Sequence, residues 1–127
     1  MADTLRVVLV DDEDLVRSGL RLLLSNAPDI EVVAEASNGR DAVATVLDTQ
    51  PDVVLMDIRM PVMDGIAAVE KILSVHTVPI IMLTAFDTDS FILRALRAGA
   101  AGFLLKSTPP ESLMAAVRAA AAGQPLL

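Results

Sequence analysis

The sequence contains no cysteine, no tryptophan and no tyrosine among its 127 residues. Without cysteine, the chain forms no disulfide and offers no thiolate to a metal ion, which fits a cytoplasmic protein. No apolar run reaches the roughly 18 residues that a membrane-spanning helix needs. No basic segment followed by an apolar one marks a signal peptide. These absences favour a cytoplasmic protein that does not contact a membrane.

Positive charge is also scarce. Ten Lys and Arg residues stand against 17 Asp and Glu residues, which gives a formal net charge of −7. Such a surface repels the phosphates of nucleic acid, so we do not expect this chain to bind DNA by itself. Apolar residues, in contrast, make up 54% of the sequence. A chain of this length and composition predicts one domain with its own core.

Five short apolar runs alternate with segments of helical periodicity. This alternation predicts an α/β fold of three layers, with a parallel sheet between helices. Right-handed crossovers and the polar second run favour the flavodoxin-like strand order 2-1-3-4-5, with the first and third strands central. The expected strands cover residues 5–10, 30–36, 53–57, 79–83 and 101–105. The last two helices are expected at about 88–98 and 110–122.

Several helix ends carry capping signals. Asn38 is expected to cap the second helix and Asp64 the third, and Gly99 to follow the end of the fourth. Thr108 is expected to cap the fifth helix, with Pro109 at its first position and Glu111 in capping-box spacing. The spacing in the fourth helix predicts an inner face made of Phe91, Ile92, Ala95 and Leu96.

Polar residues stand where four of the five apolar runs end. Asp11 and Asp12 follow the first run, Asp57 the third, Thr84 the fourth and Lys106 the fifth. The carboxyl ends of parallel strands meet at one edge of the sheet, where ligands bind in open α/β folds. At about 4 Å and an effective dielectric near 20, each pair of carboxylates repels by on the order of 4 kcal/mol. The cluster therefore needs a cation, and all-oxygen ligands suit Mg²⁺.

A carboxylate in such a cluster can act as a nucleophile toward phosphorus and form an aspartyl-phosphate. Mg²⁺ and Lys106 would neutralise the phosphoryl oxygens, and the Thr84 hydroxyl could donate to one of them. Each residue alone has a simpler interpretation. Asp57 could be a loop acid, Asp11 and Asp12 could cap a helix, and Lys106 could be solvated. Their combined positions favour the phosphoryl-transfer hypothesis.

These features resemble the receiver domain of two-component response regulators over essentially the whole chain. The resemblance lies in the acidic pair, in Asp57 with Met60-Pro61 behind it, in Thr84-Ala85 and in Lys106. It implies the CheY-like version of the predicted fold and one receiver domain over residues 1–127. Residues 98–106 are similar, more narrowly, to the NarL/LuxR-type transcriptional regulators. In those proteins a helix-turn-helix DNA-binding domain follows the receiver, so we expect the chain to be truncated, although a stand-alone receiver is the alternative.

The resemblance implies a role for each site residue. Asp57 would accept a phosphoryl group from a sensor histidine kinase. Asp12 would bind Mg²⁺ directly and Asp11 mainly through water, and Asp57 and the backbone carbonyl of Arg59 would complete the protein ligands. Thr84 and Lys106 would contact the phosphoryl group. The domain would catalyse only its own phosphorylation and dephosphorylation.

The resemblance also implies a switch. Phe103 matches the aromatic switch position of the family, although it could instead be plain core. We expect phosphorylation to draw Thr84 inward, to let Phe103 fill the vacated space, and to promote a homodimer. Arg59 and Phe86 match variable positions that flank the site. Many receivers have proline after the lysine in a cis peptide, but Ser107 stands here and leaves that peptide open.

Three rival hypotheses come from other classes. A Mg²⁺-dependent phosphohydrolase with an Asp nucleophile commonly has a second acid two residues later, where this chain has Arg59. A dinucleotide-binding domain needs G-x-G-x-x-G after the first strand, where this chain has Asp11-Asp12-Glu13-Asp14. The third is a receiver-like interaction module that is never phosphorylated.

Overall fold

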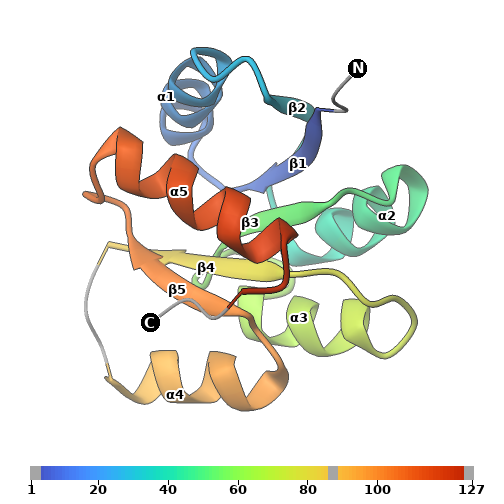
Figure 1. Ribbon diagram of the computed structural model, residues 1–127. Helices are drawn as coiled ribbons and strands as arrows, with labels where there is room; N and C mark the ends of the chain where they lie inside the picture. The colour runs from blue at the N-terminus through green and yellow to red at the C-terminus, as the bar shows by residue number, and fades with distance from the viewer. Residues whose placement is uncertain (1–3, 86–88, 125–127) are drawn as a thin grey trace.

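Five parallel strands form one sheet in the order β2-β1-β3-β4-β5 in the computed structural model, which describes residues 4–85 and 89–124 (Figure 1). The strands are β1 Leu5–Val10, β2 Ile30–Ala36, β3 Val53–Asp57, β4 Ile80–Thr84 and β5 Gly102–Leu105. The helices are α1 Asp14–Ser25, α2 Gly39–Thr49, α3 Gly65–Leu73, α4 Asp89–Ala98 and α5 Pro110–Ala121. The predicted flavodoxin-like, CheY-like order is confirmed.

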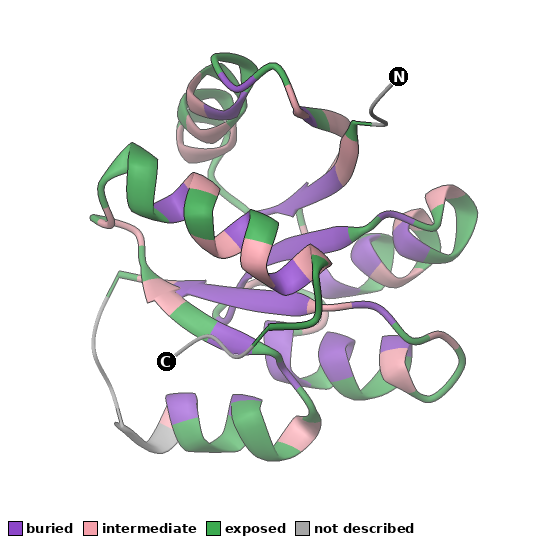
Figure 2. Ribbon diagram, viewed as in Figure 1, coloured by how far each residue is buried: buried purple, intermediate pink, exposed green. Residues whose placement is uncertain are grey.

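The sheet separates two hydrophobic cores, because successive side chains of a strand point to opposite faces. Val8, Val54 and Ile80 belong to the core beneath α2, α3 and α4. Val7 and Leu55 belong to the core beneath α1 and α5. Every residue of β3 is buried, as expected of a central strand covered on both faces (Figure 2).

Three of the predicted helix ends are confirmed. The Asn38 side chain caps α2 and accepts a hydrogen bond from the Asp41 backbone N–H at 2.8 Å. Asp64 caps α3 in the same way. Gly99 follows α4 with a φ of 113°, a conformation that costs glycine little.

The predicted start of α5 at residue 110 is confirmed, but its predicted N-cap is wrong by one residue. Pro109, not Thr108, is the N-cap residue, and Pro110 takes the first helical position. A proline fits that position because its missing N–H would have had no partner within the helix. With Pro110 there, the helix begins too late for the Thr108 hydroxyl to cap it, and no side chain does so.

One residue of the expected inner face of α4 is also misplaced. Ile92 and Ala95 are buried and Phe91 is partly buried, but Leu96 is 42% exposed. Helix α4 packs mainly against α3, and a narrow stripe made of Phe91, Ala95 and Ala98 meets the core. Leu96 lies beside that stripe rather than on it. Within residues 4–85 and 89–124, no helix is long and apolar enough to cross a bilayer.

Candidate functional site

The carboxyl edge of the sheet brings Asp11, Asp57 and Lys106 together, although they lie far apart in the sequence. The Lys106 ammonium is 2.8 Å from Asp11 Oδ2 and 3.1 Å from Asp57 Oδ2. It also lies 3.8 Å from Oε1 of Glu13, which the sequence analysis did not single out. Asp11 and Asp57 are the buried acids in the described part of the chain, at 1% and 6% exposure. The lysine thus compensates two carboxylates that the fold has removed from water.

Asp12 completes the acidic group. One oxygen from each of Asp11, Asp12 and Asp57 lies within 4.8 Å of the others, and Asp12 is exposed to solvent. Oδ2 of Asp11 is fully buried and has no hydrogen bond of suitable geometry within the described residues, so its charge is met by the ion pair with Lys106. Clustered carboxylate oxygens with one solvent-facing member suit a hard cation that retains water ligands. The residues present therefore fit a magnesium ion.

The electrostatics of the site shift two pKa values. Burial raises the pKa of Asp57, with the charge of Asp11 adding to it, against the opposing effects of Lys106 and the Arg59 backbone N–H. Burial alone would lower the pKa of Lys106, but Asp11 and Asp57 outweigh it and raise that pKa. Lys106 therefore stays protonated at neutral pH and holds a fixed positive charge beside Asp57.

Backbone hydrogen bonds hold the site residues at the strand ends. The Asp11 N–H donates to the Ala36 carbonyl, and Oδ1 of Asp11 accepts from the Glu13 N–H at 2.9 Å. The Lys106 N–H donates to the Thr84 carbonyl at 2.8 Å, so the two predicted phosphoryl contacts are neighbours. The peptide after Lys106 is trans, which resolves the question that the sequence left open.

The loop after β3 contains a turn that the sequence analysis missed. Val62 has a φ of 70°, which is unfavourable for a β-branched residue. The Met63 N–H donates to the Pro61 carbonyl at 2.7 Å and closes a three-residue turn around Val62. The Met63 carbonyl in turn accepts from the Gly39 N–H, which ties this loop to the start of α2. No local signal marked the turn, because valine is rare in this conformation.

Two of the remaining predicted residues, Phe103 and Arg59, have exposed side chains. Phe103 in β5 is 36% exposed, so its interpretation as plain core is wrong. The Arg59 side chain is exposed, with its guanidinium carbon 5.3 Å from the centre of the Phe91 ring. Phe86 lies outside the described residues. The roles of Phe103 as a switch and of the Arg59 carbonyl as a ligand stay predictions.

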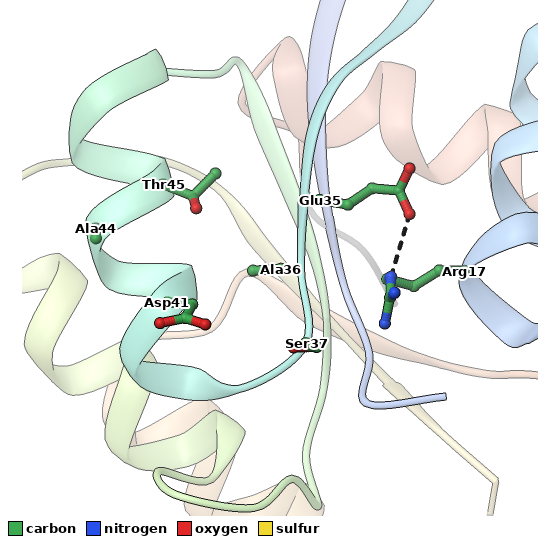
Figure 3. Close-up of a pocket in the computed structure, with 7 residues that line it drawn as sticks. All are labelled: Arg17, Glu35, Ala36, Ser37, Asp41, Ala44 and Thr45. Carbon is green, nitrogen blue, oxygen red and sulfur yellow. Dashed lines mark hydrogen bonds and ion pairs between the residues drawn. The ribbon is translucent and has the colours of Figure 1, made fainter. Parts of the chain in front are cut away.

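Arg17 is a further residue of this edge that the sequence analysis left without a role. Its guanidinium contacts the backbone carbonyl of Asp11, the side chain of Asp14 and the side chain of Glu35. Figure 3 shows Glu35, from β2, pointing toward this guanidinium at the side of a surface pocket of about 390 Å³. The pairing with Asp14 at i+3 in one helix was a detectable signal, but the contacts with Asp11 and Glu35 depend on the fold.

The chain is similar to known proteins over most of its length. The family model of the response regulator receiver domain matches residues 7–118. The chain is 46% identical over 123 residues to the transcriptional regulatory protein YxjL of Bacillus subtilis, covering 96% of the chain and 56% of that protein. It is 43% identical over 124 residues to the transcriptional regulatory protein LiaR of the same species, covering 97% of the chain and 59% of LiaR. The chain thus spans somewhat more than half the length of these relatives.

Solved structures agree with the sequence comparison. The signal receiver domain of the response regulator NarL from Mycobacterium tuberculosis matches with a TM-score of 0.92 at 36% identity, covering 96% of this chain and 99% of that one. A two-component response regulator of the LuxR family from Aurantimonas matches with a TM-score of 0.91, also at 36% identity, covering 98% of this chain and 90% of that one. The chain therefore belongs to the response regulator receiver domain family and resembles the receivers of transcriptional regulators of the LuxR/NarL type.

Proposed function

We propose that this receiver accepts a phosphoryl group on Asp57 from a sensor histidine kinase and is thereby switched on. The observation that carries the proposal is the position of Asp57, buried beside Asp11 and 3.1 Å from the Lys106 ammonium. Asp11, Asp12 and Asp57 would hold a magnesium ion, together with the backbone carbonyl of Arg59. When bound, Mg²⁺ would supply charge neutralisation for the transferred phosphoryl oxygens.

The proposed phosphoryl transfer needs no general base, because an ionised carboxylate has no proton to lose before it attacks phosphorus. A carboxylate oxygen of Asp57 forms a bond to phosphorus, the phosphorus–nitrogen bond of the donor phosphohistidine breaks, and its electron pair returns to the imidazole. The imidazole then takes a proton from solvent. Lys106, which its two acids keep protonated, stabilises the charge that develops on the phosphoryl oxygens. Thr84, whose backbone is hydrogen-bonded to Lys106, would donate from its hydroxyl to another of them.

Phosphorylation would change the face made by α4, β5 and α5, and this face would pass the signal on. Moving a two-state domain from 1:99 to 99:1 takes about 5.5 kcal/mol. Hydrogen bonds to charged groups contribute roughly 1.5–3 kcal/mol each. Contacts from Thr84 and Lys106 to the phosphoryl group approach that total, and formation of a homodimer would add the remainder. Phe103, which is 36% exposed in β5, would move into the space that Thr84 vacates.

In the full-length protein we propose a DNA-binding output domain. Its support is the pair of transcriptional regulatory proteins that this chain matches over somewhat more than half their length. The receiver itself carries a net charge of −7, so DNA contacts would come from the output domain. We place the protein in the cytoplasm, where it would meet the kinase, and propose no reaction beyond its own phosphorylation and dephosphorylation.

Intact mass spectrometry after incubation with acetyl phosphate tests the proposal. We expect wild type to gain one phosphoryl group only with Mg²⁺, and Asp57→Ala to gain none. Asp48→Ala, which changes an exposed acid of α2, is the matched control and should behave as wild type. If wild type gains nothing and binds no beryllofluoride, the chain is a phosphate-independent interaction module. Sustained turnover of phosphate esters would instead identify a phosphohydrolase.

The switch is tested separately by light scattering on beryllofluoride-loaded protein. Wild type should dimerise, and Phe103→Ala should dimerise more weakly because the aromatic ring no longer fills the space beside Thr84. A Phe103→Ala variant that dimerises as wild type does would contradict this route.

A further inference from the structure

We propose that Arg17 is a positioning residue for the metal site: it holds the Asp11–Asp12 loop against β2 so that the carboxylates converge. The inference rests on the proposed function, because it concerns the affinity of the same site for Mg²⁺. Arg17 touches no predicted ligand atom of the site. It acts through the backbone of Asp11 and through the two acids that flank its guanidinium.

The contacts of Arg17 come from three segments. Nη1 donates to the Asp11 carbonyl at 2.5 Å, at the point where β1 ends. Nε donates to Oε1 of Glu35 in β2 at 3.1 Å. Nη2 pairs with Asp14 at the start of α1. One planar guanidinium thus links the Asp11–Asp12 loop (the acidic loop) to β2 and to the start of α1. A lysine, with a single ammonium, could not form all three contacts.

Asp11 is also held by the Ala36 carbonyl and by Lys106, but beyond Asp11 the loop has few restraints of its own. Glu13 is the N-cap residue of α1, and no side chain caps that helix. The Glu13 N–H is bonded within the loop itself, to Oδ1 of Asp11. The side chain of Arg17 is only 15% exposed, whereas those of Glu13 and Asp14 are 65% and 90% exposed. Arg17 is therefore a largely buried side chain of α1, beside a loop that beyond Asp11 is largely in water.

Arg21 offers a matched control. It lies one turn further along α1 and pairs with the same Glu35 carboxylate, but it is 53% exposed and has no contact with the acidic loop within the described residues (the Arg17–Glu35 pair is drawn in Figure 3). Replacing Arg21 therefore removes a positive charge and a Glu35 partner. It leaves the bond to the Asp11 carbonyl in place.

Charge and position predict opposite effects for Arg17. A nearby positive charge repels a divalent cation, so by charge alone Arg17→Met would bind Mg²⁺ more tightly and Arg17→Lys would bind it as wild type does. If the contacts of Arg17 matter more than its charge, both variants bind Mg²⁺ more weakly. Neither methionine nor lysine can contact the Asp11 carbonyl, Asp14 and Glu35 together. Loss of a group that orients metal ligands typically lowers metal affinity by roughly 10–100-fold. We expect about tenfold here because the loop stays attached to β1 and α1.

The experiment is a MgCl₂ titration of the 127-residue chain, followed by NMR through the backbone amides of Asp12, Glu13 and Asp57. We expect the Kd for Mg²⁺ to rise about tenfold in both Arg17→Met and Arg17→Lys, and to change less than about twofold in Arg21→Met. At saturating Mg²⁺, acetyl phosphate should modify the Arg17 variants to the wild-type extent. Without Mg²⁺, exchange of the Glu13 amide should be faster in the Arg17 variants than in Arg21→Met.

Each other outcome overturns the inference. Tighter binding by Arg17→Met, or equal Kd values for the Arg17 and Arg21 variants, would show that Arg17 does not position the site. Circular dichroism checks that each variant is folded, and Arg17→Lys is the conservative variant if Arg17→Met unfolds. If wild type itself binds no Mg²⁺, the proposed function fails as well. If wild type binds Mg²⁺ and is phosphorylated on Asp57, only the inference about Arg17 is at stake.

Discussion

The two sides of this domain are packed to very different degrees. Around β1 and β3, at whose carboxyl ends Asp11 and Asp57 lie, the inward side chains are almost entirely excluded from solvent, as Leu55 is at 1% exposure. In β5, at the edge of the sheet, large apolar side chains remain in water, with Phe103 and Leu105 each 36% exposed. The difference follows from position in the sheet, because β3 has a strand on either side and β5 has only β4.

This contrast separates what must be rigid from what can move. Phosphoryl transfer needs carboxylates and ammonium held in place, and a buried central strand provides that. A switch needs a surface whose alternative arrangements differ little in free energy, and sparsely packed edge elements provide that. The exposed apolar groups of α4 and β5 are also available to a partner.

The largest expected effect compares the same substitution on the two sides. Leu55→Ala removes a fully buried side chain from β3 and should lower the free energy of unfolding by about 2–5 kcal/mol. Leu93→Ala removes a half-exposed side chain from α4 and should lower it by no more than about 1 kcal/mol. Urea unfolding followed by circular dichroism measures both, since the chain has no tryptophan for fluorescence. Equal losses would mean that the two sides are equally well packed.

A smaller effect is expected at Gly65, the glycine packed behind Asp57. A Cβ at Gly65 would overlap the backbone carbonyl of Asp57 and come within 2.9 Å of Ile58 Cα. We expect Gly65→Ala to lower the free energy of unfolding by about 1–3 kcal/mol and to reduce phosphorylation, since β3 must shift. Gly19→Ala is the matched control: a Cβ there meets nothing within 4 Å, and the exposed helix should gain about 0.5–1 kcal/mol. A loss at Gly19 as large as that at Gly65 would contradict this account.

The smallest expected effect concerns the charge of Asp57. Its pKa in the folded state is raised above 3.8 by burial, so the folded state binds this proton more tightly than the unfolded state does. Ionisation of Asp57 therefore lowers stability as pH rises above about 3.8, up to its folded pKa. Asp57→Asn should be more stable than wild type at neutral pH, by less than the Gly65→Ala loss, and the difference should vanish toward pH 3.8.

Urea unfolding at several pH values checks this prediction. Asp48→Asn, at an exposed position of α2, corrects for the general loss of one negative charge. An advantage of Asp57→Asn that persists unchanged below pH 3.8 would show that the effect does not come from ionisation.

Local patterns in the sequence predicted most of the fold. The apolar runs located all five strands to within one residue at either end, and the polar second run predicted that β2 lies at an edge. The same runs located the ends from which Asp11, Asp57 and Lys106 project, so the site followed from the strand order. These features are predictable because they depend on residues that are adjacent in the chain or on the period of a strand.

The features that the sequence did not predict correctly depend on contacts between segments that lie apart in the chain. The N-cap of α5 depended on which of two prolines takes the first helical position, and the exposure of Leu96 depended on how α4 meets the core. The turn at Val62 runs against the preference of its own residue and is tied by Met63 to the start of α2. In each case, contacts between segments outweighed local preference.

The sequence by itself determined the order of the strands, the edge of the sheet that carries the acids, and the presence of Asp11, Asp12 and Lys106 beside Asp57, but not that of Glu13. These features can be predicted because strand periodicity and the positions of charged residues depend on residues that are close together in the sequence. Only the tertiary structure decided that Lys106 bridges two buried carboxylates and that Arg17 fastens the acidic loop to β2. Those contacts join residues from different elements, and their geometry exists only once the helices and strands have packed together.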